Sequence, residues 1–422
     1  MGGGRRRDMG RAAHLRRRAG PWVAVLAALA TAFGSTGTAP ARTEAERPLA
    51  AKLARALALP QLSPDLTGAL AVDVRTGKVV YGLNERRSLA PASTEKLSVA
   101  YAALSVLGAD YRIETDVLGE GAMSGTTWHG NLVLKGGGDP TLTRAGLRAL
   151  ARSVLRLGIH SVAGGVVGDE STFDSRRTGH GWKPHYLIRE SPALSALVVD
   201  RGRYRGFAST NPPLTAAVVF REELVKAGIA VTGRATTRRS NAADYPLAFK
   251  HSARMEVIVR SMGLDSDNFT AEMLLKLLGA HQTGQGTSAA GAAVVTGVLR
   301  DAGVHLGGVR VVDGSGLSLL NRATATSLVG LLRAAWLNPN LRTSFLRALP
   351  IAGVNGTMSR RLRTGPARGR VLAKTGTTSV ASALAGFVGS RYAFAVLHNG
   401  RPVATWRARR AQDRFVTVLA AN

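Results

Sequence analysis

Residues 91–107 read PASTEKLSVAYAALSVL, a proline-led turn that runs directly into an apolar stretch. The apolar residues recur at helical spacing and Gly108 follows in the position of a helix C-cap, so the pattern predicts a helix here. Ser93 stands at its start and Lys96 three residues later, which places the hydroxyl and the amine on one face. The positive end of the helix dipole favours an attacking oxygen at Ser93, and a desolvated lysine near other cations can serve as its base.

This spacing has a structural interpretation as well as a chemical one. An N-cap serine followed by a surface lysine has the same pattern, and for this motif taken alone that interpretation is favoured. Residues 93–96 are, however, the only SxxK in the chain, and two further short motifs follow them in order. The order of the three motifs therefore carries more weight than any one of them.

The second motif is Ser266-Asp267-Asn268, in a polar loop between two stretches with amphipathic helical patterns. Packed structure on both sides would hold a hydroxyl and an amide in place, so that Ser266 could relay a proton and Asn268 could bind a substrate amide. Asp267 or Asn268 can also cap the helix that begins near Phe269. Capping and catalysis are compatible, so both interpretations stay open.

The third motif is Lys374-Thr375-Gly376, which precedes strand-like runs. A strand edge can bind an extended peptide, with Lys374 supplying positive potential and the hydroxyls of Thr375 and Thr377 binding a terminal carboxylate. Gly376 leaves room for a close approach of backbone, and the N–H groups of Thr377 and Ser93 would then form an oxyanion hole. For the tripeptide taken alone, an exposed lysine in a β-turn is the favoured alternative.

Three weak patterns in this order, each in a suitable local context, are far rarer together than any one of them. Together they resemble the D-alanyl-D-alanine carboxypeptidase/endopeptidase group of low-molecular-mass penicillin-binding proteins, which are serine DD-peptidases. The resemblance runs from about residue 50 to 400. It rests on four segments: Pro91–Lys96, Gly138–Leu142, Asp313–Ser318 and Ala373–Thr377.

The resemblance implies an α+β fold, with a penicillin-recognising serine transferase (β-lactamase-like) core of an antiparallel sheet flanked by helices. A β-rich domain would be inserted between SxxK and SxN. The implied catalytic residues are Ser93 as the acylated nucleophile, Lys96 as its base and Ser266 in the proton relay. The implied substrate-binding residues are Asn268, Lys374, Thr375, Gly376 and Thr377. Peptidoglycan stem peptides are the implied substrates and β-lactam antibiotics the covalent inhibitors, while no metal or other cofactor is implied.

The length of 422 residues, and the changes in composition and in helix- and strand-like patterns along the chain, indicate four segments. They are a signal peptide over 1–41, a first part of the transpeptidase-like core over 42–110, an inserted domain over 111–249 and a second part of the core over 250–422. The resembled family usually carries two extra domains between SxxK and SxN, and the interval of about 170 residues looks too short for both. A missing domain puts endopeptidase preference in doubt and leaves carboxypeptidase chemistry intact.

Local patterns predict the elements of both regions. In the inserted domain they predict a helix over Arg144–Leu157 and strands at Asn131–Leu134, Val166-Val167 and Ala216–Val219. In the core they predict helices at Leu49–Ala58, Val257–Met262, Thr270–Ala280, Ala289–Ala302 and Ala404–Ala421, and strands at Leu66–Val74, Val79–Tyr81, Ala383–Val388 and Tyr392–Leu397. Ser209-Thr210-Asn211 also fits SxN, but Pro212-Pro213 directly after it indicate a mobile turn, so it is set aside.

The N-terminus indicates export. A basic region with seven arginines precedes an apolar run from Trp22 to Phe33, and Ala39 and Ala41 form an A-x-A pair, which is the layout of a secretory signal peptide. The run is shorter than the ~20 residues that span a bilayer. An uncleaved signal anchor is the alternative, and membrane contact is predicted only through such a leader. The chain is therefore predicted to be extracytoplasmic, either secreted or associated with the cell envelope.

Composition excludes several classes of protein. The absence of cysteine excludes a disulfide framework, a thiol nucleophile and a Cys-based metal site. The net charge of the chain is +29, and it is +23 when residues 1–41 are left out. The 47 arginines of the chain are scattered along the sequence, and only 5% of its residues are aromatic. Attraction to an anionic cell envelope is therefore favoured, and no nucleic-acid binding is predicted.

The leading hypothesis is a serine D-alanyl-D-alanine carboxypeptidase, with endopeptidase activity as an addition, that hydrolyses peptidoglycan peptides through a Ser93 acyl-enzyme. A serine β-lactamase is the enzyme alternative, because Ser-Asp-Asn and Lys-Thr-Gly occur there too, but the domain-sized insertion argues against it. A non-catalytic penicillin- or wall-binding protein on the same fold is the alternative of a different class. The filled catalytic positions argue mildly against it.

Overall fold

The computed structural model describes residues 47–241 and 244–422. The predicted signal peptide, residues 1–41, lies outside the described residues. None of the helices in the described part of the chain combines the length and the hydropathy that a bilayer crossing needs.

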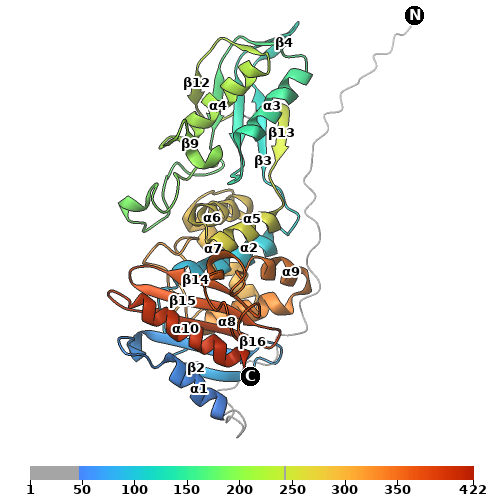
Figure 1. Ribbon diagram of the computed structural model, residues 1–422. Helices are drawn as coiled ribbons and strands as arrows, with labels where there is room; N and C mark the ends of the chain where they lie inside the picture. Colours follow the sequence, from blue (N-terminus) through green and yellow to red (C-terminus); the bar gives the residue numbers. More distant parts are fainter. Residues whose placement is uncertain (1–46, 242–243) are drawn as a thin grey trace, which may run out of the picture. The chain divides into compact units, whose positions relative to one another are not determined.

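A five-stranded antiparallel sheet carries the catalytic core (Figure 1). In the order β14-β15-β16-β1-β2, its strands are Val371–Thr377, Ala381–Val388, Tyr392–Asn399, Thr67–Asp73 and Val79–Leu83. Strands from the two ends of the chain lie side by side, because β1 pairs with β16 along its whole length. β15 is buried at every residue, as expected of a strand that is covered on both faces.

Helices cover both faces of this sheet. α1 (Arg47–Leu57) and α10 (Thr405–Ala420) lie along one face, and α8 (Ala325–Leu337) packs on the other (Figure 1). Side chains of β15 alternate between the two faces, so that Leu384 joins the hydrophobic cluster of α1 and α10 while Phe387 joins the cluster of α8. The predicted antiparallel sheet flanked by helices is therefore confirmed.

On the face with α8, one helix lies within a bundle of others. α2 (Lys96–Val106) is buried at nearly every position, which explains why its sequence has no polar face. It packs against α5, α6, α7 and α9, which span Met255–Asp265, Asn268–Thr283, Ser288–Asp301 and Pro339–Arg347. This packing brings the start of α2, with the first motif, toward the junction of α5 and α6, which holds the second.

The chain between α2 and α5 forms further sheets with their own hydrophobic cluster, which includes Val117, Leu147 and Phe220. A mixed five-stranded sheet has the order β12-β8-β6-β3-β13, with strands Ala235–Thr237, Val166–Asp169, Leu132–Gly136, Glu114–Gly119 and Tyr245–His251. α3 (Arg144–Arg156) and α4 (Pro212–Lys226) belong to the same region. A four-stranded sheet has the order β11-β7-β5-β4, with strands Ala230–Val231, Ser161–Val162, Thr127–His129 and Ala122–Ser124. A hairpin pairs β10 (Phe207–Ala208) with β9 (Arg203–Tyr204). The exact domain boundaries stay a prediction.

The structure corrects three local predictions. The run Ala216–Val219 lies inside α4 and not in a strand, because a short apolar run has no period that separates a strand from a buried helix. Pro212-Pro213 open α4 instead of forming a mobile turn, since proline is well tolerated in the first turn of a helix. Lys374-Thr375-Gly376 lies within the edge strand β14, so the β-turn alternative is wrong.

Candidate active site

Ser93 lies in a 3-10 turn, η3 (Ala92–Glu95), that runs directly into α2. It therefore stands one turn before the α-helix and not within it. Ala92 has φ 49°, in the left-handed region that a non-glycine residue seldom adopts. Gly316 packs against this strained residue, because a Cβ at Gly316 would lie 2.0 Å from the Ala92 carbonyl oxygen. Ser93 is half-buried and so remains reachable from solvent.

The Lys96 amine lies beside the Ser93 hydroxyl, as the spacing predicts. Its Nζ donates to Ser93 Oγ at 2.9 Å, to Asn268 Oδ1 at 2.8 Å and to the carbonyl oxygen of Ser315. Burial lowers the pKa of Lys96 to about 8, although nearby carboxylates, with Asp313 foremost, oppose this shift. The cause is therefore desolvation, as the sequence suggested, and the neighbouring cations that it also suggested are not among the causes. A lysine with this pKa can accept a proton near neutral pH.

The second motif lies at the junction of α5 and α6. Ser266 ends α5 with φ 56°, and its hydroxyl accepts from Lys374 Nζ at 2.8 Å. Asp267 caps α6 by accepting a backbone N–H, so the predicted capping role is confirmed for this residue. Asn268 turns its Oδ1 toward Lys96, while its Nδ2 donates to the carbonyl oxygen of Glu190 at 3.0 Å.

The third motif forms the strand wall of the site. Lys374 is 1% exposed, and its Nζ donates to Ser266 and to the Thr375 carbonyl at 2.8 Å. Burial and the charge of Lys96 hold the pKa of Lys374 well below its usual value. A Cβ at Gly376 would lie 2.9 Å from the Ser93 amide nitrogen, so the glycine lets β14 lie close to the Ser93 turn. Thr377 follows at the exposed end of β14.

The three motifs thus meet in one place. Lys96 joins Ser93 to Asn268, and Lys374 joins Ser266 to β14. Thr375 Oγ1 donates to Thr357 Oγ1 at 2.8 Å. The rejected motif Ser209-Thr210-Asn211 takes no part, since the Ser209 hydroxyl bonds within its own turn and to the first turn of α4.

A second layer of residues supports this site, and sequence reasoning assigned it no role. Asp313 is fully buried and accepts from Trp182 Nε1 at 2.6 Å and from the Ser315 hydroxyl. The Ser315 carbonyl oxygen in turn accepts a hydrogen bond from Lys96 Nζ. The resemblance singled out Asp313–Ser318 as a segment, which was the one available signal for this layer.

Arg201 is another residue beside the site that the sequence did not reveal. Its guanidinium donates to both oxygens of Asp267, at 2.7 and 2.8 Å, and lies 5.0 Å from the centre of the Phe269 ring. These bonds hold the pKa of Asp267 below its usual value although burial acts in the opposite direction. The two partners are 66 residues apart, so no local pattern could have paired them. Arg201 therefore ties the inserted region to the middle of the second motif.

In the described part of the chain, no three His, Asp or Glu side chains gather in an arrangement that would hold a metal ion. The polar groups that the site presents are two lysines, hydroxyls and backbone N–H groups.

The sequence profile of the D-Ala-D-Ala carboxypeptidase 3 (S13) family matches residues 49–206 and 202–422. The chain belongs to this family. It is 32% identical to the D-alanyl-D-alanine carboxypeptidase of Actinomadura sp. (strain R39), over 81% of this chain and 79% of that protein. It is also 32% identical to Carboxypeptidase DacB of Mycolicibacterium smegmatis, over 92% and 88% of the two chains. The predicted class, a serine-type D-Ala-D-Ala carboxypeptidase, is thereby confirmed.

Solved structures agree on the fold of this S13 carboxypeptidase. Penicillin binding protein 4 (dacB) from Haemophilus influenzae matches with a TM-score of 0.77 and 24% identity, over 86% of this chain and 98% of that one. The same protein in complex with a novel β-lactam matches with a TM-score of 0.71 and 23% identity, over the same shares. This S13 carboxypeptidase therefore aligns with nearly all of that solved neighbour.

Proposed function

We propose that this carboxypeptidase releases the terminal D-Ala of peptidoglycan stem peptides through an acyl-enzyme on Ser93. The observation that carries the proposal is the pair formed by Ser93 Oγ and Lys96 Nζ, 2.9 Å apart at the start of a buried helix. The lowered pKa of Lys96, about 8 because of its burial, suits a base that works near neutral pH.

Acylation begins when neutral Lys96 takes the proton of Ser93 and Oγ attacks the carbonyl carbon of the penultimate residue. The N–H groups of Ser93 and Thr377 bind the oxyanion that forms. When the C–N bond breaks, Lys96 gives up that proton, which passes through Ser266 to the amine of the departing D-Ala, so Lys96 is neutral again. A water molecule then attacks the ester carbonyl while Lys96 takes its proton. The bond to Ser93 Oγ breaks, Lys96 returns the proton to that oxygen, and the shortened peptide leaves.

The strand wall holds the substrate. β14 is an edge strand, so an extended peptide can pair with it. Among the described residues, no carboxylate lies within 4.0 Å of Lys374 Nζ, and the terminal carboxylate of the peptide supplies this partner, with the Thr375 and Thr377 hydroxyls beside it. Gly376 lets the peptide and the Ser93 turn approach closely. Asn268 holds a substrate amide, since Glu190 uses only one of the two protons on its Nδ2.

The same chemistry makes β-lactams covalent inhibitors, because opening of the lactam ring by Ser93 yields a stable ester. The β-lactam complex of the Haemophilus influenzae fold neighbour supports this. We place the enzyme outside the cytoplasm, where peptidoglycan lies, on the basis of the leader with its basic region and Ala39-Pro40-Ala41.

The test incubates the protein with a fluorescent penicillin and, separately, with a stem peptide ending in D-Ala-D-Ala. Wild type should form a stable adduct and release D-Ala, and Ser93→Ala should do neither. Ser105→Ala, an exposed serine further along α2, is the matched control and should behave as wild type. Rapid turnover of the penicillin without D-Ala release would show a β-lactamase instead. A cross-linked peptide dimer as a further substrate measures endopeptidase activity.

A further inference from the structure

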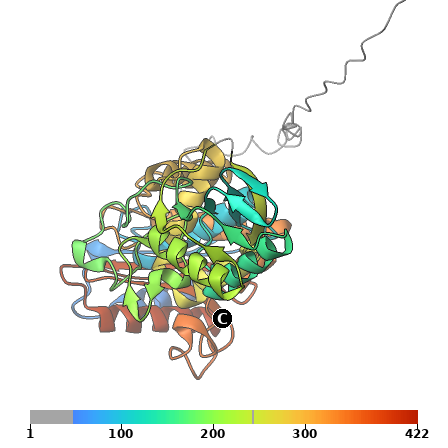
Figure 2. The same cartoon turned by 90° about the horizontal axis from the view of Figure 1, so that it is seen from above.

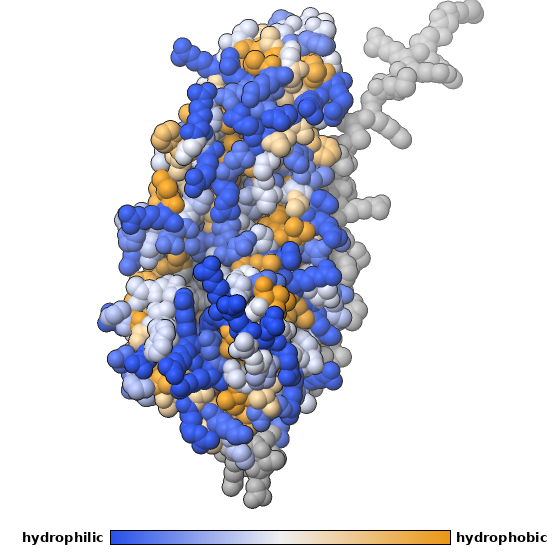
Figure 3. Space-filling view, in the orientation of Figure 1, coloured by the Kyte–Doolittle hydropathy of each residue, from blue (hydrophilic) through white to orange (hydrophobic). Residues whose placement is uncertain are grey.

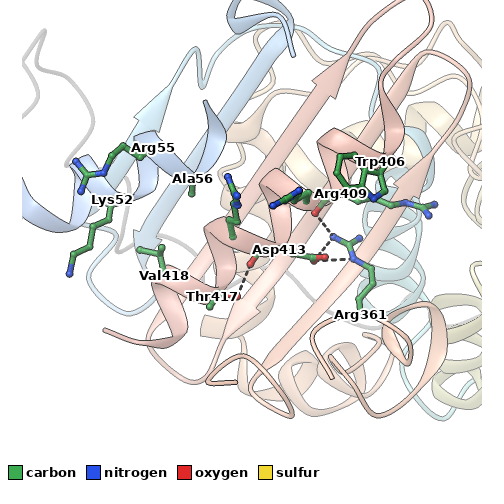
Figure 4. A pocket seen from close by; sticks show the side chains of 11 residues that line it. Lys52, Arg55, Ala56, Arg361, Trp406, Arg409, Asp413, Thr417 and Val418 are labelled. Atoms are coloured by element: carbon green, nitrogen blue, oxygen red, sulfur yellow. Dashed lines mark hydrogen bonds and ion pairs between the residues drawn. The ribbon is translucent and has the colours of Figure 1, made fainter. Parts of the chain in front are cut away.

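A groove lies between α1 and α10, on the sheet face opposite α8 (Figure 4). Its volume is about 760 Å³, and we call it the α10 groove. α10 lies at the outside both in Figure 1 and in the view turned by 90° (Figure 2). Figure 3 shows many strongly hydrophilic side chains in the lower part of the molecule, with smaller apolar patches between them. Six cations line the groove: Lys52, Arg55, Arg361, Arg409, Arg410 and Arg414.

Only one acidic residue, Asp413, lines the same groove. It is already bound by Arg361, whose Nε and Nη2 lie 3.0 and 2.7 Å from Asp413 Oδ1 (Figure 4). None of the other five cations has a carboxylate within 4.0 Å among the described residues. Uncompensated charges around one concavity repel each other and focus a positive potential that attracts an anionic ligand.

The geometry favours an oxyanion with several charges. Arginine outnumbers lysine in the groove, and the guanidinium fork binds phosphate or carboxylate with two parallel hydrogen bonds. Arg410 is oriented by stacking on Trp406, with its guanidinium carbon 5.3 Å from the ring centre. Arg409 reaches the active-site strand, where its Nη2 donates to Thr377 Oγ1 at 3.2 Å. A bound polymer would therefore lie next to the edge of the sheet that carries the catalytic motif.

Two other kinds of anionic partner fit the groove less well. Trp406 is the only aromatic side chain that lines it, and Arg407 and Arg410 both stack on its ring, so no free platform for a nucleic-acid base remains. Phe415, Val416 and Leu419 of α10 are buried against the sheet. Trp406 is the one large apolar side chain that the helix exposes, and arginines stack on its ring, so the helix has no continuous apolar face to insert into a bilayer.

We propose that the α10 groove binds a polyol-phosphate polymer of the cell envelope, with its phosphodiesters held by the arginine side chains. Such a chain carries one permanent negative charge on every repeat, which matches several neighbouring cations. The inference rests on the proposed extracytoplasmic location. In this proposal the α10 groove keeps the enzyme bound to the anionic polymer that surrounds its substrate in the cell envelope.

The experiment measures binding of labelled poly(glycerol phosphate) to the full protein by fluorescence anisotropy, together with acylation by a fluorescent penicillin. Binding should weaken steeply between about 50 and 200 mM salt, since phosphate contacts release counterions. Arg410→Glu/Arg414→Glu should reduce the affinity by at least about tenfold, because charge-assisted contacts to phosphate are lost and two negative charges are added. Arg152→Glu/Arg156→Glu on α3 changes the net charge equally, away from the groove, and should alter the affinity by less than about twofold.

Acylation by the penicillin separates the possible failures. Normal acylation in both double variants shows that they fold and that the active site is intact, so a loss of polymer binding then belongs to the groove. Equal binding by wild type and Arg410→Glu/Arg414→Glu, or an equal loss in the α3 variant, overturns the proposal. Tighter binding of single-stranded DNA or of anionic lipid vesicles than of the polymer overturns it as well. Absent acylation in wild type would instead contradict the proposed function.

Discussion

The active site lies between a helical wall, formed by the start of α2 and the junction of α5 and α6, and the strand wall of β14. Each wall presents one buried lysine, but the two lysines have different electrostatic surroundings. Lys96, on the helical wall, lies near four carboxylates, of which Asp313 acts most strongly, and its pKa falls to about 8 because burial outweighs them. Lys374, on the strand wall, has only the charge of Lys96 to add to its burial, and its pKa falls further. The comparison indicates that Lys96 is tuned as a base, whereas Lys374 lacks an anion that the substrate can bring.

The largest effect is expected when the base is removed from the helical wall. Lys96→Met should slow acylation of Ser93 by about 10³-fold, within the range that general bases contribute. Stopped-flow measurement of penicillin acylation and release of D-Ala from a stem peptide both test this. Lys374→Met is the comparison, and its effect on penicillin acylation should be smaller. Equal losses in the two variants would contradict the division of roles.

The next largest effect is expected at the interaction between Lys374 and the terminal carboxylate of the substrate. Lys374→Gln should lower kcat/KM for a peptide with a free terminal carboxylate by roughly tenfold to a hundredfold, because a hydrogen bond to a charged group is lost. A peptide with an amidated C-terminus should be a poor substrate for wild type and should lose little more in the variant. If the variant lost the same factor on both peptides, Lys374 would not be the carboxylate partner.

The acylation rate should depend on pH through Lys96. Its amine can accept a proton only when neutral, so the rate should rise with pH through a midpoint near the Lys96 pKa of about 8. Burial raises the pKa of Glu95 to about 8, and its charge, once formed, raises the pKa of Lys96, so Glu95→Gln should move the midpoint slightly to lower pH. A pH–rate profile for wild type and variant measures both. A midpoint that moves upward, or a rate that falls with pH, would contradict the assignment of the base.

The smallest effect is expected at the contact that supports the helical wall from the inserted region. Arg201→Ala removes both bonds to Asp267 and should slow acylation by about threefold to tenfold, with partial recovery in Arg201→Lys. Arg205→Ala, a neighbouring and largely exposed arginine, is the control and should leave the rate unchanged. Equal rates in Arg201→Ala and wild type would mean that Asp267 needs no support from the inserted region.

The sequence by itself determined the features that depend on near neighbours. The three-residue spacing of Ser93 and Lys96 sufficed to place hydroxyl and amine together, because one helical turn sets that distance. Asp267 was one of two residues predicted to cap α6, and β15 and β16 were predicted as consecutive strands, for the same local reason. The order of the motifs led to the family. Where a local pattern was ambiguous, as in the run Ala216–Val219, the sequence prediction was wrong.

Only the tertiary structure decided which residues far apart in the sequence are in contact at the active site. Lys96 and Asn268 are 172 residues apart, and Ser266 and Lys374 are 108 apart, yet each pair is joined by a hydrogen bond of 2.8 Å. The tie of Arg201 to Asp267 and the α10 groove, built from the two ends of the described chain, belong to the same class. Such contacts depend on how helices and sheets pack against one another, and short-range residue preferences carry no information about that packing.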